Sequence, residues 1–362
     1  MAIDAEKLKS LVEGEVLSSS FDQGRYATDA SIYQIRPRAV LIPKTWTDVE
    51  AALEFANSEG ISLLPRGGGT SQSGQTVGDA LVIDFTKHLN KVEHYDAKKG
   101  RITVQPGLVL DDLNRRLKAD GWWYPVDVST ASRATLGGMA ANNSCGSRSI
   151  RYGKMQDNVE ALEAILTSGE LHRFAALRPD AALDADMRAL ALREEAEIRA
   201  RFPRVLRRVG GYNIDALLGD APNMGQLLIG SEGTLAITKS LDLKLSPTLT
   251  TKTLGVCHFP TFHAAMDAAQ HIVKLNPVAV ELVDQNMIRL GRGIPQFKPI
   301  VDRFVKGEPA ALLLVEFAET NAENRRRLSA LGDLMAELGF RWGDPGKREG
   351  GVVEAEDPSF QA

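Results

Sequence analysis

Residues 66–75 read Arg-Gly-Gly-Gly-Thr-Ser-Gln-Ser-Gly-Gln and follow directly on an apolar run at 61–65. A short apolar run that ends in such a stretch is typical of a buried strand that leads into a loop. Glycine permits positive φ and a close approach of the backbone, and successive exposed N–H groups can form a nest for an anion such as a pyrophosphate. Taken alone, the glycine triplet fits a tight surface turn about as well.

Two better-known phosphate-binding motifs do not fit this loop. The dinucleotide fingerprint needs a glycine where this chain has Gln72. A P-loop needs a lysine after its last glycine, where this chain has Gln75. We therefore reject a nucleoside triphosphatase and leave the role of the loop open at this point.

The sequence around the loop alternates between strand-like and helical patterns. Apolar runs at 39–43, 61–65 and 80–84 predict three strands. After the first run, apolar residues recur at helical spacing, so we expect a helix with Thr47 or Asp48 as its N-cap. A strand, a helix and a strand in this order predict a βαβ unit with a parallel pair.

Further patterns extend this organisation to the end of the chain and predict two domains, 1–248 and 249–362. In the first, we expect one or two surface helices within 176–209. The other expected elements are strands at 91–95 and 101–105, a helix at 109–119, strands at 252–258, 278–283 and 310–317, and helices at 261–275 and 321–338.

Composition argues against several classes of protein. The net charge of −4 offers no basic surplus for nucleic acid, and we expect the short basic cluster at 204–208 on the solvated surface. Two distant cysteines predict neither a disulfide framework nor a zinc site. No stretch is apolar enough for a signal peptide or a membrane span. We expect a cytoplasmic protein and leave open peripheral association with the inner face of the membrane.

Two more segments decide what the glycine-rich loop does. Residues 125–127, 135–146 and 151–153 form a stretch with almost no bulky side chain between 129 and 149, as a backbone packed on a flat ligand requires. Residues 230–238 form a glycine-bracketed turn that enters an apolar strand. Without the glycine-rich loop, each segment fits ordinary tight packing.

In order and spacing, these segments resemble the FAD-linked oxidases typified by vanillyl-alcohol oxidase and p-cresol methylhydroxylase. The match is closest to the FAD-linked D-2-hydroxyacid dehydrogenases, and the stretch 141–153 is similar to large bacterial members with an iron–sulfur domain. The resemblance implies an α+β fold, with a two-part FAD-binding domain of the p-cresol methylhydroxylase type over 1–248. Residues 249–362 would form an incomplete ferredoxin-like cap domain on the substrate side.

The resemblance also places particular residues on FAD. The pyrophosphate would lie on the glycine-rich loop, the isoalloxazine and ribityl part on the second segment, and the adenosine end on the third. The residues implied are, in that order, Arg66, Gly67, Gly68, Gly69, Thr70, Ser71 and Gln75; Asp127, Thr135, Gly138, Asn142 and Gly146; and Glu232, Gly233 and Ile237. Thr70 stands where some members carry a histidine that links the flavin covalently, so we expect noncovalent FAD.

The activity that the resemblance implies is FAD-dependent oxidation of a D-2-hydroxyacid, such as lactate, glycolate or 2-hydroxyglutarate, with hydride transfer to flavin N5. A quinone, a cytochrome or an iron–sulfur domain would then accept the electrons, and an iron–sulfur cluster is expected only if a longer chain exists. The alternatives are oxidation of another alcohol or a lactone, and an inactive FAD-binding fragment or subunit. No catalytic residue is assigned.

For several other residues we expect an ordinary structural or surface role. We expect Cys145 to be buried and inert rather than linked to flavin, and His258, His263 and His271 to lie on the surface rather than on a metal. Glu281 and Asp284 are expected at a capped helix start. Arg289 and Arg292 are candidates for the substrate carboxylate by location only, with solvent exposure the simpler expectation.

The second domain also looks unfinished. The family's cap continues past a point that resembles residues 357–361, and its arginine and histidine motifs are not found here. We therefore expect a truncated cap in which apolar side chains of the strand at 310–317, such as Leu312, Leu314 and Val315, lack partners.

Overall fold

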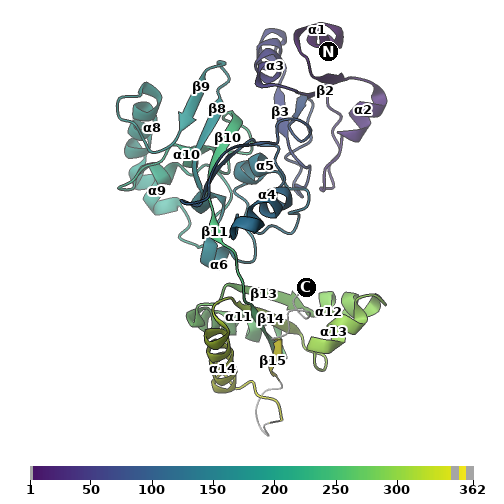
Figure 1. Ribbon diagram of the computed structural model, residues 1–362, viewed down its shortest axis with the longest axis vertical. Helices are drawn as coiled ribbons and strands as arrows, with labels where there is room; N and C mark the ends of the chain where they lie inside the picture. Colours follow the sequence, from purple (N-terminus) through teal and green to yellow (C-terminus); the bar gives the residue numbers. More distant parts are fainter. Residues whose placement is uncertain (1–2, 344–349, 356–362) are drawn as a thin grey trace. The chain divides into compact units, whose positions relative to one another are not determined.

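The computed structural model describes residues 3–343 and 350–355. The chain forms two compact units, which are shown in Figure 1. The first consists of Met1–Gly146 with Gly153–Pro247, and the second of Ser147–Tyr152 with Thr248–Ala362.

The first sheet of the first unit contains the expected βαβ unit. Its order is β1 (Glu15–Leu17), β2 (Ala39–Ile42), β4 (Leu81–Asp84) and β3 (Leu63–Arg66). β2 and β3 both pair parallel with β4, so the third strand lies between the first two. Apolar side chains of α3 (Trp46–Glu59), such as Val49 and Phe55, are buried in one core with residues of these strands.

The start of α3 differs from the prediction by two residues. Thr45 is the N-cap, and its hydroxyl accepts a hydrogen bond from the Asp48 amide at 3.4 Å. The buried Asp48 carboxylate accepts from the amides of Glu13, Lys44 and Thr45, so Asp48 is the third residue of a capping box. The prediction of Thr47 or Asp48 as the cap was wrong, because Asp48 serves backbone groups that precede the helix.

The second sheet is antiparallel, which gives the unit its two parts. Its order is β5 (Val92–Asp96), β6 (Arg101–Val104), β10 (Ile237–Lys244), β8 (Val159–Ile165) and β9 (Leu171–Phe174). The largest core packs side chains of these strands with α4 (Leu110–Leu117) and α5 (Leu136–Asn142). The segment 176–209 contains two helices, α8 (Ala182–Arg193) and α9 (Glu195–Arg201), as predicted.

Shorter elements complete the described part of this unit. They are α1 (Ala5–Leu11), α2 (Ser20–Arg25), β7 (Trp122–Trp123), α7 (Met155–Asn158), α10 (Gly225–Leu228) and β11 (Ser246–Pro247). The 3₁₀ turns Lys118–Asp120 and Ile214–Leu217 follow α4 and precede α10.

The second unit has the ferredoxin-like β-α-β-β-α-β topology. The elements are β12 (Thr253–Phe259), α11 (Phe262–Ile272), β13 (Ala279–Asp284), β14 (Ala311–Phe317), α14 (Asn321–Glu337) and β15 (Gly351–Ala355). The sheet order is β13-β14-β12-β15, with all pairs antiparallel. Two helices, α12 (Gln285–Gly293) and α13 (Lys298–Phe304), are inserted between β13 and β14.

Both faces of this sheet are covered. Cys257, Leu313 and Val315 pack in one core with α11 and α14, whereas Val256 and Leu312 pack in a second core with Ile288 of α12. The expectation that the apolar residues of β14 lack partners is therefore wrong, since Leu312 and Val315 are fully buried and Leu314 is half-buried. The inserted helices, which the sequence did not reveal as a covering layer, supply partners for Leu312 and Leu314, whereas Val315 packs with α11 and α14. Residues 357–361 lie outside the described residues.

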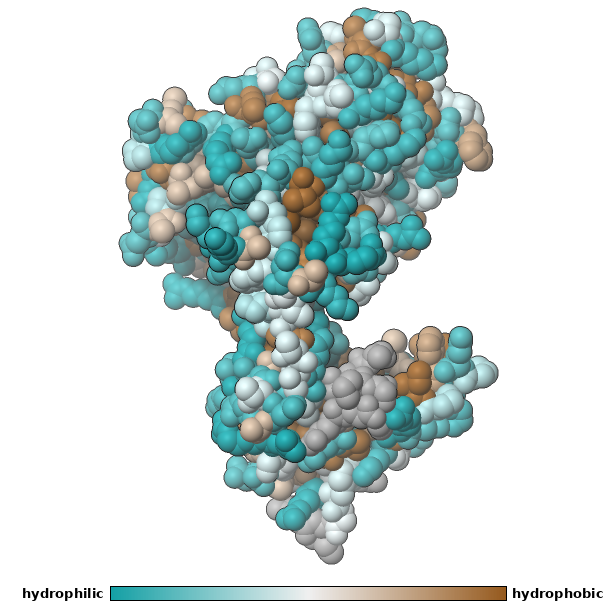
Figure 2. All heavy atoms as spheres, in the orientation of Figure 1, coloured by the Kyte–Doolittle hydropathy of each residue, from teal (hydrophilic) through white to brown (hydrophobic). Residues whose placement is uncertain are grey.

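Polar and charged side chains cover most of the face of each unit seen in Figure 2. Among the described helices, none combines the length and the apolar character needed to cross a lipid bilayer.

Candidate functional site

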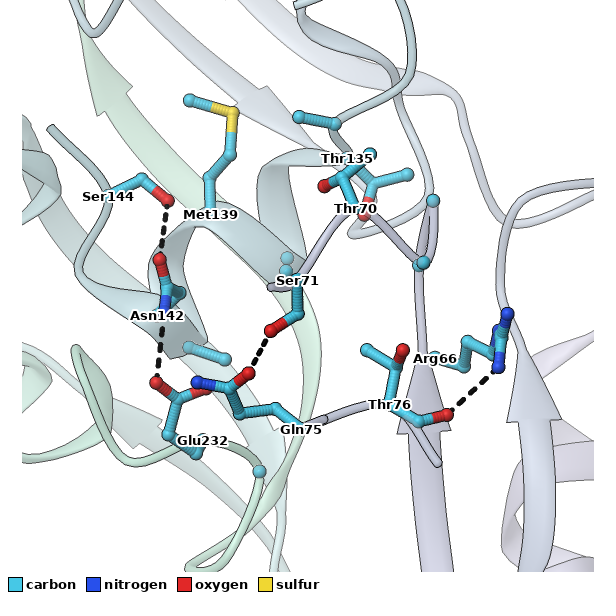
Figure 3. A pocket seen from close by; sticks show the side chains of 18 of the residues that line it. Arg66, Thr70, Ser71, Gln75, Thr76, Thr135, Met139, Asn142, Ser144 and Glu232 are labelled. Carbon is cyan, nitrogen blue, oxygen red and sulfur yellow. Dashed lines mark hydrogen bonds between the residues drawn. The ribbon is translucent and has the colours of Figure 1, made fainter. Parts of the chain in front are cut away.

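The first unit encloses a cavity of about 430 Å³ where the three sequence segments meet (Figure 3). One side is the loop after β3, another is α5 with the loop that follows it, and a third is the turn before β10. A volume in this range is usual for cofactor and small-molecule sites.

The loop after β3 offers a row of backbone donors. None of the backbone N–H groups of residues 68–72 donates a hydrogen bond within the described part of the chain, and all five residues line the cavity. Gly69 has φ +64°, a left-handed conformation that side chains rarely adopt. Unpaired N–H groups along a turning backbone form a nest that favours an anion.

Close packing explains the other two glycines of the triplet. A Cβ on Gly67 would lie 2.0 Å from Oγ1 of Thr135, and one on Gly68 would lie 2.2 Å from the Arg133 carbonyl oxygen. These two positions therefore need glycine to bring the loop against the segment that precedes α5. The contact joins the first two predicted segments without any ligand.

Arg66 lines the cavity, but its guanidinium is used by the protein itself. It donates to the carbonyl oxygens of Tyr26 (3.1 Å), Thr28 (2.8 Å) and Thr76 (2.9 Å), and the last bond is drawn in Figure 3. Burial lowers the pKa of Arg66, while the nearby Asp84 and Tyr26 raise it. The side chain thus clamps both ends of the loop, a role that the sequence did not reveal.

Helix α5 is tied to the turn before β10 by backbone and side-chain bonds. The amides of Gly230 and Glu232 donate to the carbonyl oxygens of Ala140 (3.0 Å) and Ala141 (2.9 Å). Nδ2 of Asn142 donates to Oε1 of Glu232 at 3.0 Å (Figure 3). The second and third segments therefore form one wall.

Glu232 is the acidic side chain of this wall. It has φ +53°, which is rare for a residue with a side chain. Burial raises the pKa of Glu232, whereas hydrogen bonds from Asn142 and Gln75 lower it. Gln75 in turn accepts a hydrogen bond from the Ser71 hydroxyl, so the carboxylate is linked to the glycine-rich loop (Figure 3).

Most of the predicted site residues come together here. Those that line the cavity are Arg66, Gly67, Gly68, Gly69, Thr70, Ser71, Gln75, Thr135, Gly138, Asn142, Glu232 and Gly233. Asp127, Gly146 and Ile237 are not in its lining: a Cβ on Gly146 would lie 2.0 Å from Oδ1 of Asp127, and Ile237 is buried in the core of the first sheet. The lining also contains Met139, Ser144 and Val209, which the sequence reasoning did not single out.

Cys145 was expected to be buried, and it is only half-buried in the cavity lining. The exposed Arg207 places Nη2 2.8 Å and Nε 3.2 Å from its Sγ. The basic cluster at 204–208 is not all free surface either, because Arg208 pairs with Asp215 at 2.7 Å. The contact of Arg207 with Cys145 joins residues 62 apart in the sequence, so no local pattern signals it.

The histidines behave differently from one another. His258 is fully buried rather than on the surface; Nδ1 lies 2.9 Å from the Val256 carbonyl oxygen, and Nε2 accepts from the Lys306 amide at 3.0 Å. His263 is exposed, and His271 is half-buried near the end of α11. Over residues 3–343 and 350–355, no cluster of three or more His, Cys, Asp or Glu side chains could hold a metal.

Asp284 and Arg292 have structural partners, whereas Glu281 is exposed on β13 and not at a helix start, so the expectation for Glu281 was wrong. Asp284 is the N-cap of α12, as expected, and accepts from the Met287 amide at 2.9 Å. Arg289 is exposed. Arg292 is instead held by Asp302 and Glu308, at 3.0 Å and 2.8 Å, so the expectation of free solvent exposure was wrong for this residue.

Two protein families match the sequence. Residues 37–175 match the FAD binding domain family, and residues 249–349 match the C-terminal domain of FAD linked oxidases.

Individual relatives agree with these matches. The chain is 32% identical over 351 residues to D-2-hydroxyglutarate dehydrogenase of Haemophilus influenzae, a match that covers 90% of this chain and 34% of the relative. It is 30% identical to D-2-hydroxyglutarate dehydrogenase of Escherichia coli, again over 90% of this chain and 34% of the relative. D-lactate dehydrogenase [cytochrome] 1 of Saccharomyces cerevisiae is 28% identical over 70% of this chain and 38% of the relative. The chain thus spans about a third of the length of these relatives.

The fold is also found in a solved structure. Alkyldihydroxyacetonephosphate synthase superposes with a TM-score of 0.70 at 18% sequence identity, over 98% of this chain and 61% of that chain. At this identity the similarity concerns the fold alone. It confirms the predicted α+β class.

Proposed function

The chain belongs to the FAD-linked oxidase family, and on that premise we propose that it oxidises a D-2-hydroxyacid of the lactate, glycolate or 2-hydroxyglutarate type to the 2-oxoacid. The observation that carries this proposal is the cavity of the first unit, because the three segments that resemble the family build it together. The names of the relatives give the substrate class.

The residues present fit FAD. The cofactor carries a pyrophosphate, and the unpaired N–H groups of residues 68–72 offer an anion several donors without a competing carboxylate in that loop. Small residues such as Gly137, Gly138 and Ala141 leave the opposite wall open to a flat ring. We propose that Asp127 and Gly146, which pack on each other outside the lining, support this wall from behind, and that Ile237 anchors the turn before β10 in the core of the first sheet.

When bound, FAD supplies the acceptor for the hydride that leaves Cα of the hydroxyacid. The residues of the chain hold and orient the cofactor. Residues 68–72 hold the diphosphate, and the Arg66 clamp keeps the loop in place. Thr70 offers no histidine nitrogen for a covalent bond to the ring, so the cofactor is held noncovalently.

We also propose the remaining roles from family membership. Residues 1–248 serve as the FAD-binding domain and 249–362 as the substrate-side cap. A quinone, a cytochrome or an iron–sulfur domain takes up the electrons, and the protein works in the cytoplasm or peripherally at the inner face of the membrane. The catalytic base and the carboxylate-binding residue are not assigned.

The test uses the chain loaded with FAD, without oxygen. We expect the visible absorbance of the flavin to bleach with D-lactate, D-2-hydroxyglutarate or glycolate, and not with L-lactate or L-2-hydroxyglutarate. In a separate sample of the oxidised protein, acid precipitation should leave the yellow colour in the supernatant. Bleaching by an alcohol or an aldonolactone alone would assign the other oxidase function. Bound FAD that no substrate bleaches would contradict the activity and identify an FAD-binding part without turnover.

A further inference from the structure

A 2-hydroxyacid carries a carboxylate, and the proposed function leaves open which residue binds it. A carboxylate that leaves water for a protein cavity needs a charged partner or several hydrogen bonds. Among the described residues of the cavity lining, Arg66 is the only one with a positively charged side chain. Its guanidinium already donates to three backbone carbonyl groups. The substrate therefore needs a second cation, from a residue beside the lining.

Arg207 is a cation at the edge of this cavity. Its Nη2 and Nε atoms lie 2.8 Å and 3.2 Å from Sγ of Cys145, which lines the cavity. Over residues 3–343 and 350–355, no acidic side chain forms an ion pair with Arg207. The neighbouring Arg208, by contrast, pairs with Asp215 at 2.7 Å. The charge of Arg207 is therefore available to an anion.

The thiol of Cys145 occupies the place that a carboxylate would take. Nε and one terminal nitrogen form the side of a guanidinium that binds two carboxylate oxygens as a fork. In Arg207 this side faces a sulfur atom, which is a weak acceptor. A carboxylate would form charge-assisted bonds there, which are about twice as strong as bonds between neutral groups. It can therefore displace the sulfur at little cost.

The chain on both sides of Arg207 is held within the first unit. Before it, the Leu206 carbonyl oxygen accepts a hydrogen bond from Nζ of Lys154 at 3.3 Å. After it, the half-buried Arg208 forms its ion pair and Val209 lines the cavity. All of these residues belong to the first unit. The guanidinium thus extends from a backbone that is already in position for a ligand.

We propose that Arg207 binds the carboxylate of the substrate at the ring end of the cavity. This inference rests on the proposed function, which places the flat ring beside the segment 135–146, and Cys145 lies near the end of that segment. The hydroxyl-bearing carbon of the substrate is bonded directly to the carboxylate. A carboxylate on Arg207 therefore holds this carbon beside the ring, as hydride transfer requires.

The first test measures anion binding and needs no turnover. Oxalate, an unreactive dicarboxylate, is titrated into the chain with and without FAD, and calorimetry gives its dissociation constant. We expect Arg207→Gln to weaken oxalate binding about thirty-fold or more. Arg207→Lys keeps the charge but not the fork, and should weaken binding by about three- to ten-fold.

The matched control is Arg204→Gln in the same basic cluster. Arg204 is exposed, and its guanidinium reaches only the Arg199 carbonyl oxygen, at 3.5 Å, among the described residues. Its oxalate constant should stay within about two-fold of the parent. A parent that binds no oxalate, or equal constants in the parent and Arg207→Gln, would overturn the inference. Loss of FAD itself from Arg207→Gln would also overturn it, because the guanidinium would then serve the cofactor.

The second test compares D-lactate with D-lactamide, which has the same hydroxyl and carbon skeleton but no charge. With FAD bound, the rate of flavin bleaching by D-lactate should fall about a hundred-fold in Arg207→Gln, whereas the rate with D-lactamide should stay within about three-fold. An equal loss with both compounds would show that Arg207 does not act on the carboxylate. A parent that holds oxalate through Arg207 but is bleached by no hydroxyacid would contradict the proposed oxidation alone, and the carboxylate site would stand.

Discussion

Asn142 and Glu232, ninety residues apart in the sequence, share a hydrogen bond of 3.0 Å from Nδ2 to Oε1 that joins the end of α5 to the turn before β10. The carboxylate of Glu232 is partly buried, and the residue has a backbone φ of +53°. The wall that these two segments form thus depends on an acidic group for which burial makes the charged form costly.

This environment predicts that Glu232→Gln stabilises the chain without FAD at neutral pH. The pKa of Glu232 is raised in the folded state, so the folded chain retains this proton to higher pH than the unfolded chain. The stability that protonated Glu232 contributes is fully present below its pKa in the unfolded chain. It is lost as the pH rises through its pKa in the folded chain. We expect Glu232→Gln to melt about 1–3 °C higher at pH 7.5 and no higher at pH 4.

The control is Glu50→Gln, on the exposed face of α3, which should change the melting temperature at neither pH. A variant Glu232→Gln that melts lower than the parent at pH 7.5 would show that the bonds from Asn142 and Gln75 outweigh the burial of the charge.

His258 predicts the opposite dependence on pH in the second unit. Burial lowers its pKa, although its bond to the Val256 carbonyl raises it, and Nε2 already accepts the Lys306 amide. A protonated ring would place a second N–H against that donor. The stability from neutral His258 is full above the unfolded pKa of about 6.5 and is lost as the pH falls toward the folded pKa.

Urea unfolding of the second unit, followed by Trp342 fluorescence, would measure this effect. Between pH 7.5 and 5.5 the parent should lose stability with a slope of up to about 1.4 kcal/mol per pH unit from this group. His258→Gln should be less stable than the parent at pH 7.5 and show a flatter dependence. Equal slopes in the two proteins would mean that other groups govern the pH response.

The sequence predicted the order of the main strands and helices because their apolar periodicity is local. The parallel unit of β2, β3 and β4 and the strands β12, β13 and β14 of the second unit are examples, whereas β15 was not predicted. The site was predicted as far as motif positions go, and the roles of its residues on FAD remain predictions. A local pattern could not show which acceptors the Arg66 guanidinium bonds. The carbonyl groups of Tyr26 and Thr76 come close to it only when the chain folds. The burial of His258 was missed for the same reason.

Asp184 on α8 predicts a large loss of stability. Its side chain is 1% exposed; Oδ1 lies 3.1 Å from Nε2 of His172 on β9, and Oδ2 accepts from the Arg178 amide at 2.8 Å. Asp184→Ala leaves a buried ring nitrogen and an amide without this acceptor, which should cost about 2–4 kcal/mol. The exposed Asp186, on the same helix, gives the control Asp186→Ala, for which we expect less than about 0.5 kcal/mol. Chemical denaturation measures both, and equal effects would contradict the assigned role.

Gly138 is a better position than the glycine triplet for a substitution that asks whether FAD occupies the cavity. A Cβ on Gly68 would strike the Arg133 carbonyl and disturb the fold before any ligand binds. Gly138 lies within α5 and lines the cavity, and its Cβ would meet only Oγ1 of Thr135, at 3.2 Å. A larger side chain there fills the space for the ligand, while the helix gains from losing a glycine.

We therefore expect Gly138→Leu to fold with a melting temperature close to that of the parent and to lose FAD affinity by about a hundred-fold or more. The matched control is Gly332→Leu in α14 of the second unit, where a Cβ meets nothing within 4 Å and which is not in the lining of this cavity. Flavin fluorescence quenching measures the affinity, and thermal unfolding without FAD measures the fold. If Gly138→Leu binds FAD like the control while both remain folded, the cofactor does not occupy this cavity, because a leucine side chain at this point leaves no room for a ring beside α5.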